Sequence, residues 1–375
     1  MLAKLTDVCD IQYGYAFDSA QFSETEGIPL VRIRDIVRGF SETCTTESFP
    51  EEYLVHDGDI LIGMDGEFNI ARWHGGTAAL NQRVCRLIPQ RINSEYIFHF
   101  MPSALKAIEN KTPFVTVKHL SAKELNRIMV PIPVIDEQIR IGNTLNEVGG
   151  IIEARQQQLR AFDTLIKARF VEMFGIYPAN EKGWSTGTIR DLVTEVRYGS
   201  SRKAAEGTSG QFPYLRMNNI TYNGELDLSD TKTIDVPEEE LDKCTVRRGD
   251  LLFNRTNSKE LVGKTCVYNR DERMVLAGFV VRVRLNEKVL PEFVSAFMNT
   301  DFSKQMLLNM CKAAIGQANI NAQELQNIGI YIPPISLQKE FVCFKDQIDK
   351  SKVVVQAALD KAQLLFNSLM QQYFG

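Results

Sequence analysis

The chain lacks the residue patterns on which most enzymes depend. Its four histidines are scattered without HxH or HxxxH spacing, and its seven cysteines never form a CxxC pair. We therefore expect neither a zinc site nor a disulfide framework, and we interpret the cysteines as reduced thiols of a cytoplasmic protein. Asp65 and Glu67 are a close acidic pair on a glycine-rich stretch, and such pairs more often form a solvated turn than a catalytic centre.

Nucleotide-binding and methyl-donor motifs are also missing. The Gly263-Lys264-Thr265 run lacks the glycine that opens a GxxxxGK[ST] loop, and no GxGxxG motif follows an expected strand. The FxGxG and [ND]PP[YF] motifs of amino-methyltransferases are absent as well. The sequence therefore predicts no catalytic residue, no metal site and no cofactor in this chain.

The chain has no strong charge and no long apolar run. Its net charge is −4, residues 1–135 carry more acidic than basic side chains, and residues 176–335 carry equal numbers. A nucleic-acid surface would therefore have to arise from local clusters of basic residues. No apolar run approaches membrane length and residues 1–7 do not resemble a signal peptide, so we expect a cytoplasmic protein without a membrane partner.

What the chain does contain is a repeat. Residues 136–175 match residues 336–375 without a gap, so that Gln138 aligns with Gln338 and Gly175 with Gly375. Each copy follows a proline-bearing strand end, has no internal proline and ends in Phe-Gly. We expect two single helices, with Asp136 and Ser336 as N-caps and the glycines as stops.

Alternate steps of three and four residues select a mostly apolar series in each copy. The two series are Leu145, Val148, Ile152, Arg155, Leu159, Phe162, Ile166, Arg169 and Met173, and Lys345, Ile348, Lys352, Val355, Leu359, Ala362, Phe366, Leu369 and Tyr373. This spacing is typical of a coiled-coil seam, and each helix would be about 57 Å long at 1.5 Å per residue. We expect the helices to pack antiparallel, because two independent surface helices would leave the matched seams unexplained.

The segments before the two helices form a second, less regular repeat. In the first, residues 28–36, 60–62 and 80–87 indicate strands, residues 94–109 a helix, and residues 121–127 a short helix with Glu124 in a capping box. The offset to the second copy grows from 184 at Pro29 and Pro213 to 191 at Gly58 and Gly249 and 200 at Leu120 and Ile320. The order of strands and helices, which we call the frame, is therefore duplicated, while the loops differ in length.

We therefore predict an α+β fold with two duplicated α+β domains separated by a long antiparallel two-helix coiled coil, with pseudo-twofold symmetry. The expected division is residues 1–135 for the first domain, 136–175 for the first helix, 176–335 for the second domain and 336–375 for the second helix.

Several runs resemble the target-recognition domains of type I restriction–modification specificity (S) subunits. They are Pro213 to Thr221, Gly249 to Lys264, Gln317 to Ile320 and Ile332 to Gln338, with weaker matches at Leu80 to Arg83 and Ile132 to Gln138. Together with the repeat, the resemblance covers the whole chain.

The resemblance implies a subunit without catalysis. Each recognition domain would read one half of a bipartite double-stranded DNA target, and the helix pair would set the spacer. Expected partners are two methyltransferase (M) subunits and restriction/translocase (R) subunits, which would hold S-adenosylmethionine, ATP and Mg.

Candidate DNA-binding residues follow from side-chain chemistry. Arg suits guanine, Asn suits adenine, and Ser and Thr suit bases or phosphate, while Lys259 and Lys264 suit phosphates. The second-domain candidates are Tyr198, Ser200, Ser201, Arg202, Lys203, Arg216, Asn218, Asn219, Asn254, Arg255, Thr256, Asn257, Ser258, Lys259 and Lys264. The first-domain candidates are Tyr13 together with Arg32, Arg34, Asn81, Gln82 and Arg83, which we take as equivalents of the second-domain loops.

Two other functions remain open at the sequence level. One is a self-contained DNA modification or restriction enzyme with an unrecognised catalytic motif, which the missing methyltransferase motifs argue against. The other is a cytoskeletal or adaptor protein that uses the coiled coil alone, which the duplicated polar loops argue against.

Overall fold

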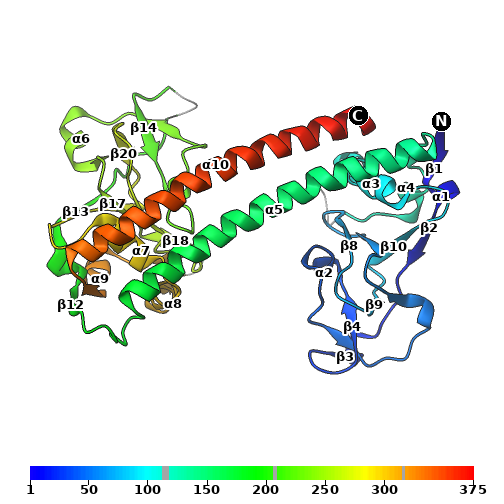
Figure 1. Ribbon diagram of the computed structural model, residues 1–375, viewed down its shortest axis with the longest axis horizontal. Coiled ribbons are helices and arrows are strands. Elements are labelled where there is room, and N and C mark those ends of the chain that lie inside the picture. The colour runs from blue at the N-terminus through cyan, green and yellow to red at the C-terminus, as the bar shows by residue number, and fades with distance from the viewer. Residues whose placement is uncertain (112–117, 206–208, 315–316) are drawn as a thin grey trace. The chain divides into compact units, whose positions relative to one another are not determined.

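The computed structural model describes residues 1–111, 118–205, 209–314 and 317–375. It contains two compact units, one made of Met1–Arg155 with Ala358–Gly375 and the other of Gln156–Ala357. Each unit holds one α+β domain and parts of two long helices, which run green and red in Figure 1. Within the described residues, no helix combines the length and the apolar character needed to cross a membrane.

The first domain is built on two sheets. One has the strand order β2–β10–β7–β8 and the other the order β3–β5–β4–β9–β6, with a single parallel pair between β4 and β9. A third, two-stranded sheet pairs β1 with β11. The strands are β1 (Leu2–Lys4), β2 (Cys9–Tyr13), β3 (Phe22–Ser23), β4 (Ile28–Val31), β5 (Cys44–Thr45), β6 (Leu54–Val55), β7 (Ile60–Gly63), β8 (Ile70–Arg72), β9 (Ala78–Leu80), β10 (Val84–Pro89) and β11 (Met129–Pro131). The helices are α1 (Leu5–Val8), α2 (Ile33–Arg38), α3 (Ser94–Lys111) and α4 (Ala122–Leu125), with short 3-10 turns at Ser19–Gln21 and Glu51–Tyr53.

The second domain repeats this topology. Its sheets have the orders β13–β21–β17–β19 and β15–β14–β20–β16, again with one parallel pair, between β14 and β20, and β12 pairs with β24 as β1 pairs with β11. A small additional sheet has the order β18–β23–β22. The strands are β12 (Ser185–Thr188), β13 (Val193–Tyr198), β14 (Phe212–Leu215), β15 (Lys232–Ile234), β16 (Thr245–Val246), β17 (Leu251–Asn254), β18 (Thr256–Asn257), β19 (Thr265–Val267), β20 (Met274–Leu276), β21 (Val280–Leu285), β22 (Lys312–Ala314), β23 (Gln317–Asn319) and β24 (Gly329–Ile332). The helices are α6 (Glu238–Cys244), α7 (Pro291–Met298), α8 (Asp301–Met310) and α9 (Ala322–Gln326), with 3-10 turns at Ile189–Leu192 and Met217–Asn219.

Two of the expected strands do not extend over their full predicted ranges. The run 28–36 is strand only to Val31 and then turns into α2, because the buried Asp35 carboxylate accepts a hydrogen bond of 2.9 Å from the Arg32 backbone N–H and caps the helix. The run 80–87 is broken by a turn at residues 81–83 between β9 and β10. The strand at 60–62, the helix from residue 94 and the Ser121–Glu124 capping box are confirmed.

The two long helices are present as α5 (Ile135–Phe174) and α10 (Ile335–Phe374). They begin one residue before Asp136 and Ser336, which therefore lie in the first turn and are not N-caps. Every residue of the two predicted seam series is buried or half-buried, whereas Val353, Val354 and Leu364 outside the series are about 70% exposed. The coiled-coil seam is confirmed.

Contacts between the helices show that they run antiparallel. In the second unit, Asp163 forms an ion pair with Lys352, and Arg169, farther along α5, pairs at 3.1 Å with Glu340, which is earlier in α10. In the first unit, the guanidinium of Arg140 lies 5.9 Å from the centre of the Tyr373 ring.

Each domain is fixed to the helices by the same buried contacts. Gln138 Oε1 accepts from the backbone N–H of Asn93 at 2.9 Å, and Gln338 Oε1 accepts from that of Leu290 at 2.8 Å. Each amide also donates to a proline carbonyl five residues earlier, at 2.8 Å in both copies. The repeat that aligns these glutamines therefore marks two equivalent joints between a domain and a helix.

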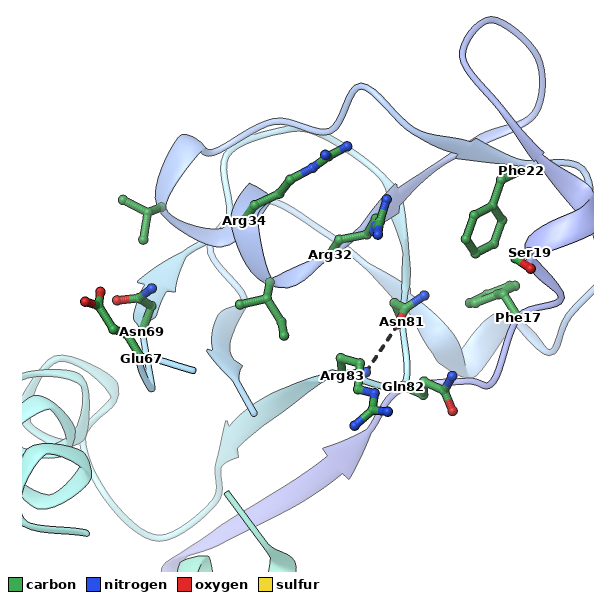
Figure 2. A pocket seen from close by; sticks show the side chains of 12 residues that line it. Phe17, Ser19, Phe22, Arg32, Arg34, Glu67, Asn69, Asn81, Gln82 and Arg83 are labelled. Atoms are coloured by element: carbon green, nitrogen blue, oxygen red, sulfur yellow. Dashed lines mark hydrogen bonds between the residues drawn. The ribbon is translucent and has the colours of Figure 1, made fainter. Parts of the chain in front are cut away.

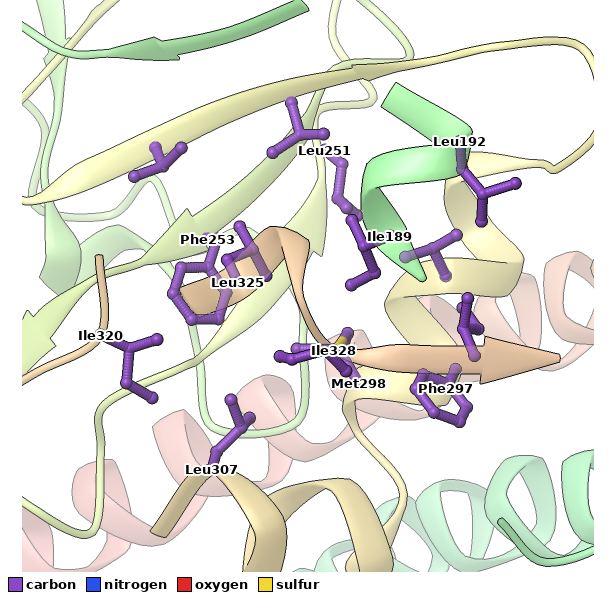
Figure 3. Close-up of a cluster of buried hydrophobic side chains, with 14 of the residues drawn as sticks. Ile189, Leu192, Leu251, Phe253, Phe297, Met298, Leu307, Ile320, Leu325 and Ile328 are labelled. Atoms are coloured by element: carbon purple, nitrogen blue, oxygen red, sulfur yellow. The ribbon is translucent and has the colours of Figure 1, made fainter. Parts of the chain in front are cut away.

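Aromatic side chains at the helix ends complete each core. Phe374, at the end of α10, packs on Tyr96 of the first domain with 5.3 Å between ring centres. Phe174, at the end of α5, packs on Phe293 of the second domain at 4.9 Å. The second-domain core continues through apolar side chains of both sheet and helices, labelled in Figure 3: Ile189, Leu192, Leu251, Phe253, Phe297, Met298, Leu307, Ile320, Leu325 and Ile328.

The second domain has an additional tie to the helices. Its loop at residues 221–225 places Glu225 2.6 Å from Lys352, whose ammonium also pairs with Asp163, and Asn223 Nδ2 donates to Asp163 at 2.6 Å. Because Lys352 lies between two carboxylates, its pKa is raised even though burial acts in the opposite direction. This loop is therefore held by residues of both α5 and α10.

Candidate nucleic-acid interface

Two glycines set the same turn in both domains. A Cβ at Gly14 would lie 2.0 Å from the Asn81 carbonyl oxygen, and one at Gly199 would lie 2.2 Å from the Ala277 carbonyl oxygen, so neither position accepts a side chain. The residue after each glycine donates its backbone N–H to the last carbonyl of a neighbouring strand. Tyr15 donates to the Leu80 carbonyl at 2.8 Å, and Ser200 donates to the Leu276 carbonyl at 2.7 Å. Tyr13 and Tyr198, which precede the glycines, are therefore equivalent.

Backbone hydrogen bonds also show that the tips of two hairpins, one in each domain, occupy equivalent positions. The Met64 N–H donates to the Arg83 backbone carbonyl at 3.0 Å, and the Met64 carbonyl accepts from the Leu120 backbone N–H at 2.7 Å. In the second domain, the Arg255 backbone N–H likewise donates to the Phe279 carbonyl at 2.9 Å, and the Arg255 carbonyl accepts from the Ile320 backbone N–H at 2.9 Å. The tip of the β7–β8 hairpin (residues 64–69) therefore corresponds to the longer tip of the β17–β19 hairpin (residues 255–264).

These equivalences change the sequence-based assignment of residues 81–83. Residues 81–83 occupy the position of residues 277–279, and not that of the Asn254–Lys259 loop. Arg32 is equivalent to Arg216, since each backbone N–H donates to a side-chain oxygen three residues on, Asp35 at 2.9 Å and Asn219 at 2.8 Å. The counterpart of the second-domain loop in the first domain is the tip that contains Asp65 and Glu67.

The first-domain candidates meet around one cavity of about 820 Å³ (Figure 2). All of them except Tyr13 line it, and the full lining is Phe17, Ser19, Phe22, Arg32, Ile33, Arg34, Val37, Glu67, Asn69, Asn81, Gln82 and Arg83. Arg32, Arg34, Gln82 and Arg83 are exposed, whereas Asn81 is buried and accepts from the Arg83 backbone N–H at 3.2 Å. The cavity thus combines guanidinium and amide groups with an aromatic end.

Asp65 holds one of these arginines in place. Its carboxylate lies 3.0 Å from Arg83 Nη1 and 2.6 Å from His119 Nδ1, and its side chain is 18% exposed. The expected solvated turn is therefore wrong for Asp65, which is a paired and largely buried group. Arg34 is held in a similar way, 3.6 Å from Asp35 and 3.3 Å from the Thr43 hydroxyl.

In the second domain, Arg255 and Tyr198 lie together. The guanidinium carbon of Arg255 lies 5.0 Å from the centre of the Tyr198 ring, and Tyr198 Oη accepts from the Ala322 backbone N–H at 3.2 Å. Arg255 Nε is buried with no hydrogen-bond partner among the residues that the structure describes. The contact with the ring restricts the guanidinium, which favours bidentate pairing.

Several second-domain candidates are buried and shape the loops. Lys264 donates to the Met217 carbonyl at 2.8 Å, and burial lowers the pKa of this lysine, so the phosphate contact expected from the sequence is not available in this conformation. The other buried candidates are Asn254, Thr256, Ser200 and Asn219, and the last donates to the Asp227 carbonyl at 2.8 Å.

The remaining second-domain candidates reach the surface. Arg202 pairs with Glu240 at 2.7 Å and Arg216 with Asp230 at 2.8 Å. Asn257 is half-buried, and Ser201, Lys203, Asn218, Ser258 and Lys259 are exposed. Among the described residues, no group of three or more His, Cys, Asp or Glu side chains could hold a metal ion.

Comparison with protein families gives a match over most of the chain. The family described as type I restriction modification DNA specificity domain matches residues 1–161 and 181–360. The EcoBI specificity subunit of Escherichia coli is 26% identical over 411 residues, covering 99% of this chain and 84% of that protein. The EcoKI specificity subunit of Escherichia coli (strain K12) is 22% identical over 403 residues, covering 99% and 86%.

A solved structure shows the same fold. The S subunit of a type I restriction–modification system from M. genitalium superimposes with a TM-score of 0.61 at 12% identity, over 100% of this chain and 96% of that chain.

Proposed function

The chain belongs to the type I restriction modification DNA specificity domain family, and on this premise we propose that it reads a bipartite DNA sequence and has no catalytic role. The observation that carries the proposal is the duplicated frame with different tips. The two domains share strand order and backbone hydrogen bonds, but one tip is Met64-Asp65-Gly66-Glu67 and the other Arg255-Thr256-Asn257-Ser258. One frame with two different polar surfaces suits two different half-sites.

Each domain presents side chains of the types that read base edges. In the first domain, Arg32, Arg34 and Gln82 are exposed around the cavity, and in the second Arg255 lies over the ring of Tyr198. A guanidinium pairs with the O6 and N7 of guanine, and an amide with the N6 and N7 of adenine. Lys203 and Lys259, both exposed, suit phosphate contacts.

We propose that residues 1–135 and 176–335 read the two half-sites, and that residues 136–175 and 336–375 hold them at a fixed spacing. The spacer length would then follow from the helices and not from the DNA. The shared joints at Gln138 and Gln338 support this division, because each ties one domain to the start of one helix.

The proposed partners are two methyltransferase subunits on the helix pair, with restriction/translocase subunits beyond them, in the cytoplasm. Exposed apolar side chains on α10, Val353, Val354 and Leu364, support a docking role, since isolated coiled coils keep such positions polar. S-adenosylmethionine, ATP and Mg would bind to these partners. A net charge of −4 fits a subunit whose partners supply part of the affinity for the DNA phosphate backbone.

Two measurements test the proposal. The full chain, co-expressed with a methyltransferase subunit of the same type I system, should select one bipartite motif from a random DNA library. With labelled S-adenosylmethionine, that complex should methylate the motif, while the chain alone should transfer no label and cleave no DNA. Transfer by the chain alone would favour a self-contained enzyme, and selection of one continuous motif would contradict two reading domains.

A further inference from the structure

The tip of the β7–β8 hairpin directs two polar side chains into the first-domain cavity. Phe68, at the centre of the tip, is 6% exposed and packs into the first-domain core. The residues on either side of it, Glu67 and Asn69, line the cavity, and Figure 2 shows them together at the end opposite Phe17 and Phe22. The buried phenylalanine therefore anchors the tip while its neighbours face outward.

The segment at residues 118–120 holds this tip. Gly66, with φ of +75°, donates its N–H to the Lys118 carbonyl at 2.8 Å, and Leu120 donates to Met64 at 2.7 Å. The Asp65 carboxylate lies 2.6 Å from His119 Nδ1. Because the backbone around Glu67 is hydrogen-bonded, the base of its side chain has a fixed position at the edge of the cavity, from which the exposed carboxylate can rotate towards a ligand.

Glu67 differs from the acid two residues before it. Asp65 is paired with Arg83 and His119, whereas the exposed Glu67 carboxylate has no hydrogen bond or ion pair among the described residues. It is also the single carboxylate in a lining that includes Arg32, Arg34 and Arg83. These arginines reduce the repulsion between Glu67 and DNA phosphates, so a carboxylate can approach the duplex here.

A second, independent observation comes from the other domain. The tip that carries Glu67 has the same place in the hydrogen-bonded frame as the tip that begins at Arg255. The proposed base-reading loop of the second domain thus has its counterpart in the tip at residues 64–69, which carries Glu67.

We propose that Glu67 reads a cytosine in the first half-site by accepting a hydrogen bond from its exocyclic N4 amino group in the major groove. This inference rests on the proposed function and adds to it the base class at one position. An ionised carboxylate only accepts hydrogen bonds, so it suits cytosine, whose major-groove edge offers a donor, and is repelled by the acceptors of guanine and by O4 of thymine. Adenine offers its N6 donor beside the N7 acceptor, an arrangement that suits an amide.

The test compares the sequences selected by four complexes, each containing the full chain and its methyltransferase partner: wild type, Glu67→Gln, Glu67→Ala and Glu24→Gln. Glu24 is an exposed glutamate of the same domain that does not line the cavity, so its variant measures the general effect of removing one negative charge. Thermal unfolding of all four should agree, since Glu67 and Glu24 are both exposed.

We expect wild type and Glu24→Gln to select the same bipartite motif with cytosine at one position of the first half-site. Glu67→Ala should lose roughly tenfold of the preference for cytosine at that position, and Glu67→Gln should shift it towards adenine. The second half-site should not change. An identical motif from all four complexes, or an equal change at every position, would overturn the assignment of Glu67. Failure of the wild type to select any bipartite motif would instead contradict the proposed function itself.

Discussion

Arg255 lies over the ring of Tyr198, with 5.0 Å from its guanidinium carbon to the centre of the ring. The ring is in turn oriented by the hydrogen bond that the Ala322 N–H donates to its hydroxyl at 3.2 Å. A guanidinium held against a ring loses less conformational freedom when it pairs with a base, so this contact prepares Arg255 for bidentate pairing.

Replacing Arg255 by alanine should therefore reduce discrimination at one position of the second half-site by about 1–3 kcal/mol. Arg255→Lys should not restore it, because an ammonium cannot form the planar fork. Binding of single-base variants of the selected motif measures this. Arg248→Ala is the matched control, since Arg248 is exposed and pairs with Asp271 at 2.7 Å. Equal weakening on all sequences would identify Arg255 as a phosphate contact.

Removal of the buried Gln338 amide should destabilise the joint between α10 and the second domain. Gln338→Ala leaves the Leu290 N–H without its acceptor at 2.8 Å, at a cost of about 1–3 kcal/mol. Hydrogen exchange at residues 288–297 should speed up accordingly, while the first domain is unaffected. Gln363→Ala, at an exposed site on the same helix, serves as the control. Unchanged exchange near Leu290 would mean that the joint contributes no stability.

The stability of the first domain should depend on pH through His99. Burial lowers the pKa of His99 from its ordinary 6.5, although the hydrogen bond to Asn146 at 2.7 Å acts in the opposite direction. Asn146 Nδ2 donates to Glu95 at 2.9 Å, so its oxygen faces His99, whose Nε2 then carries the proton of the neutral ring.

Because the unfolded chain takes up a proton at His99 more readily than the folded chain, stability should fall as pH drops below about 6.5 and stop falling below the folded pKa. Thermal unfolding followed from pH 7.5 to pH 5 measures this loss. It should be smaller in His99→Gln than in wild type, and His74→Gln, at an exposed histidine, should behave as wild type. The same slope in His99→Gln would assign the effect to other groups.

The length of the helix pair should set the number of base pairs between the two half-sites. Four residues inserted at Gly149–Gly150, and four at the matching position Asp349–Lys350, add about 6 Å to each helix and nearly keep its phase. Apart from adjacent residues and the backbone of α5 itself, no described heavy atom lies within 4 Å of a Cβ built at Gly149 or Gly150, so the first insertion point is not packed against another side chain. With a base-pair rise of about 3.4 Å, the selected spacer should lengthen by one or two base pairs while both half-sites stay the same. An unchanged spacer in the library selection would show that the helices do not set the distance.

The sequence predicted the features that depend on regular spacing. The α5 and α10 seams follow from a repeat of three and four residues, and the matched glutamines from a constant offset. The sequence does not reveal the tip at residues 64–69, because the equivalence of Met64 to Arg255 is carried by backbone hydrogen bonds and not by side-chain identity. Lys264 was placed at the surface because burial of a lysine depends on a distant partner, the Met217 carbonyl, which no local pattern reveals.

The offset between the two copies grows through the domains and then stays at 200 through the whole of α5 and α10. Loops absorb an extra residue by bulging outward, but one extra residue in an α-helix rotates everything beyond it by about 100°. Such a rotation would carry Phe174 away from Phe293, which it now meets at 4.9 Å. Evolution can therefore change the reading loops one residue at a time, whereas a lasting change in helix length must come in steps close to whole turns.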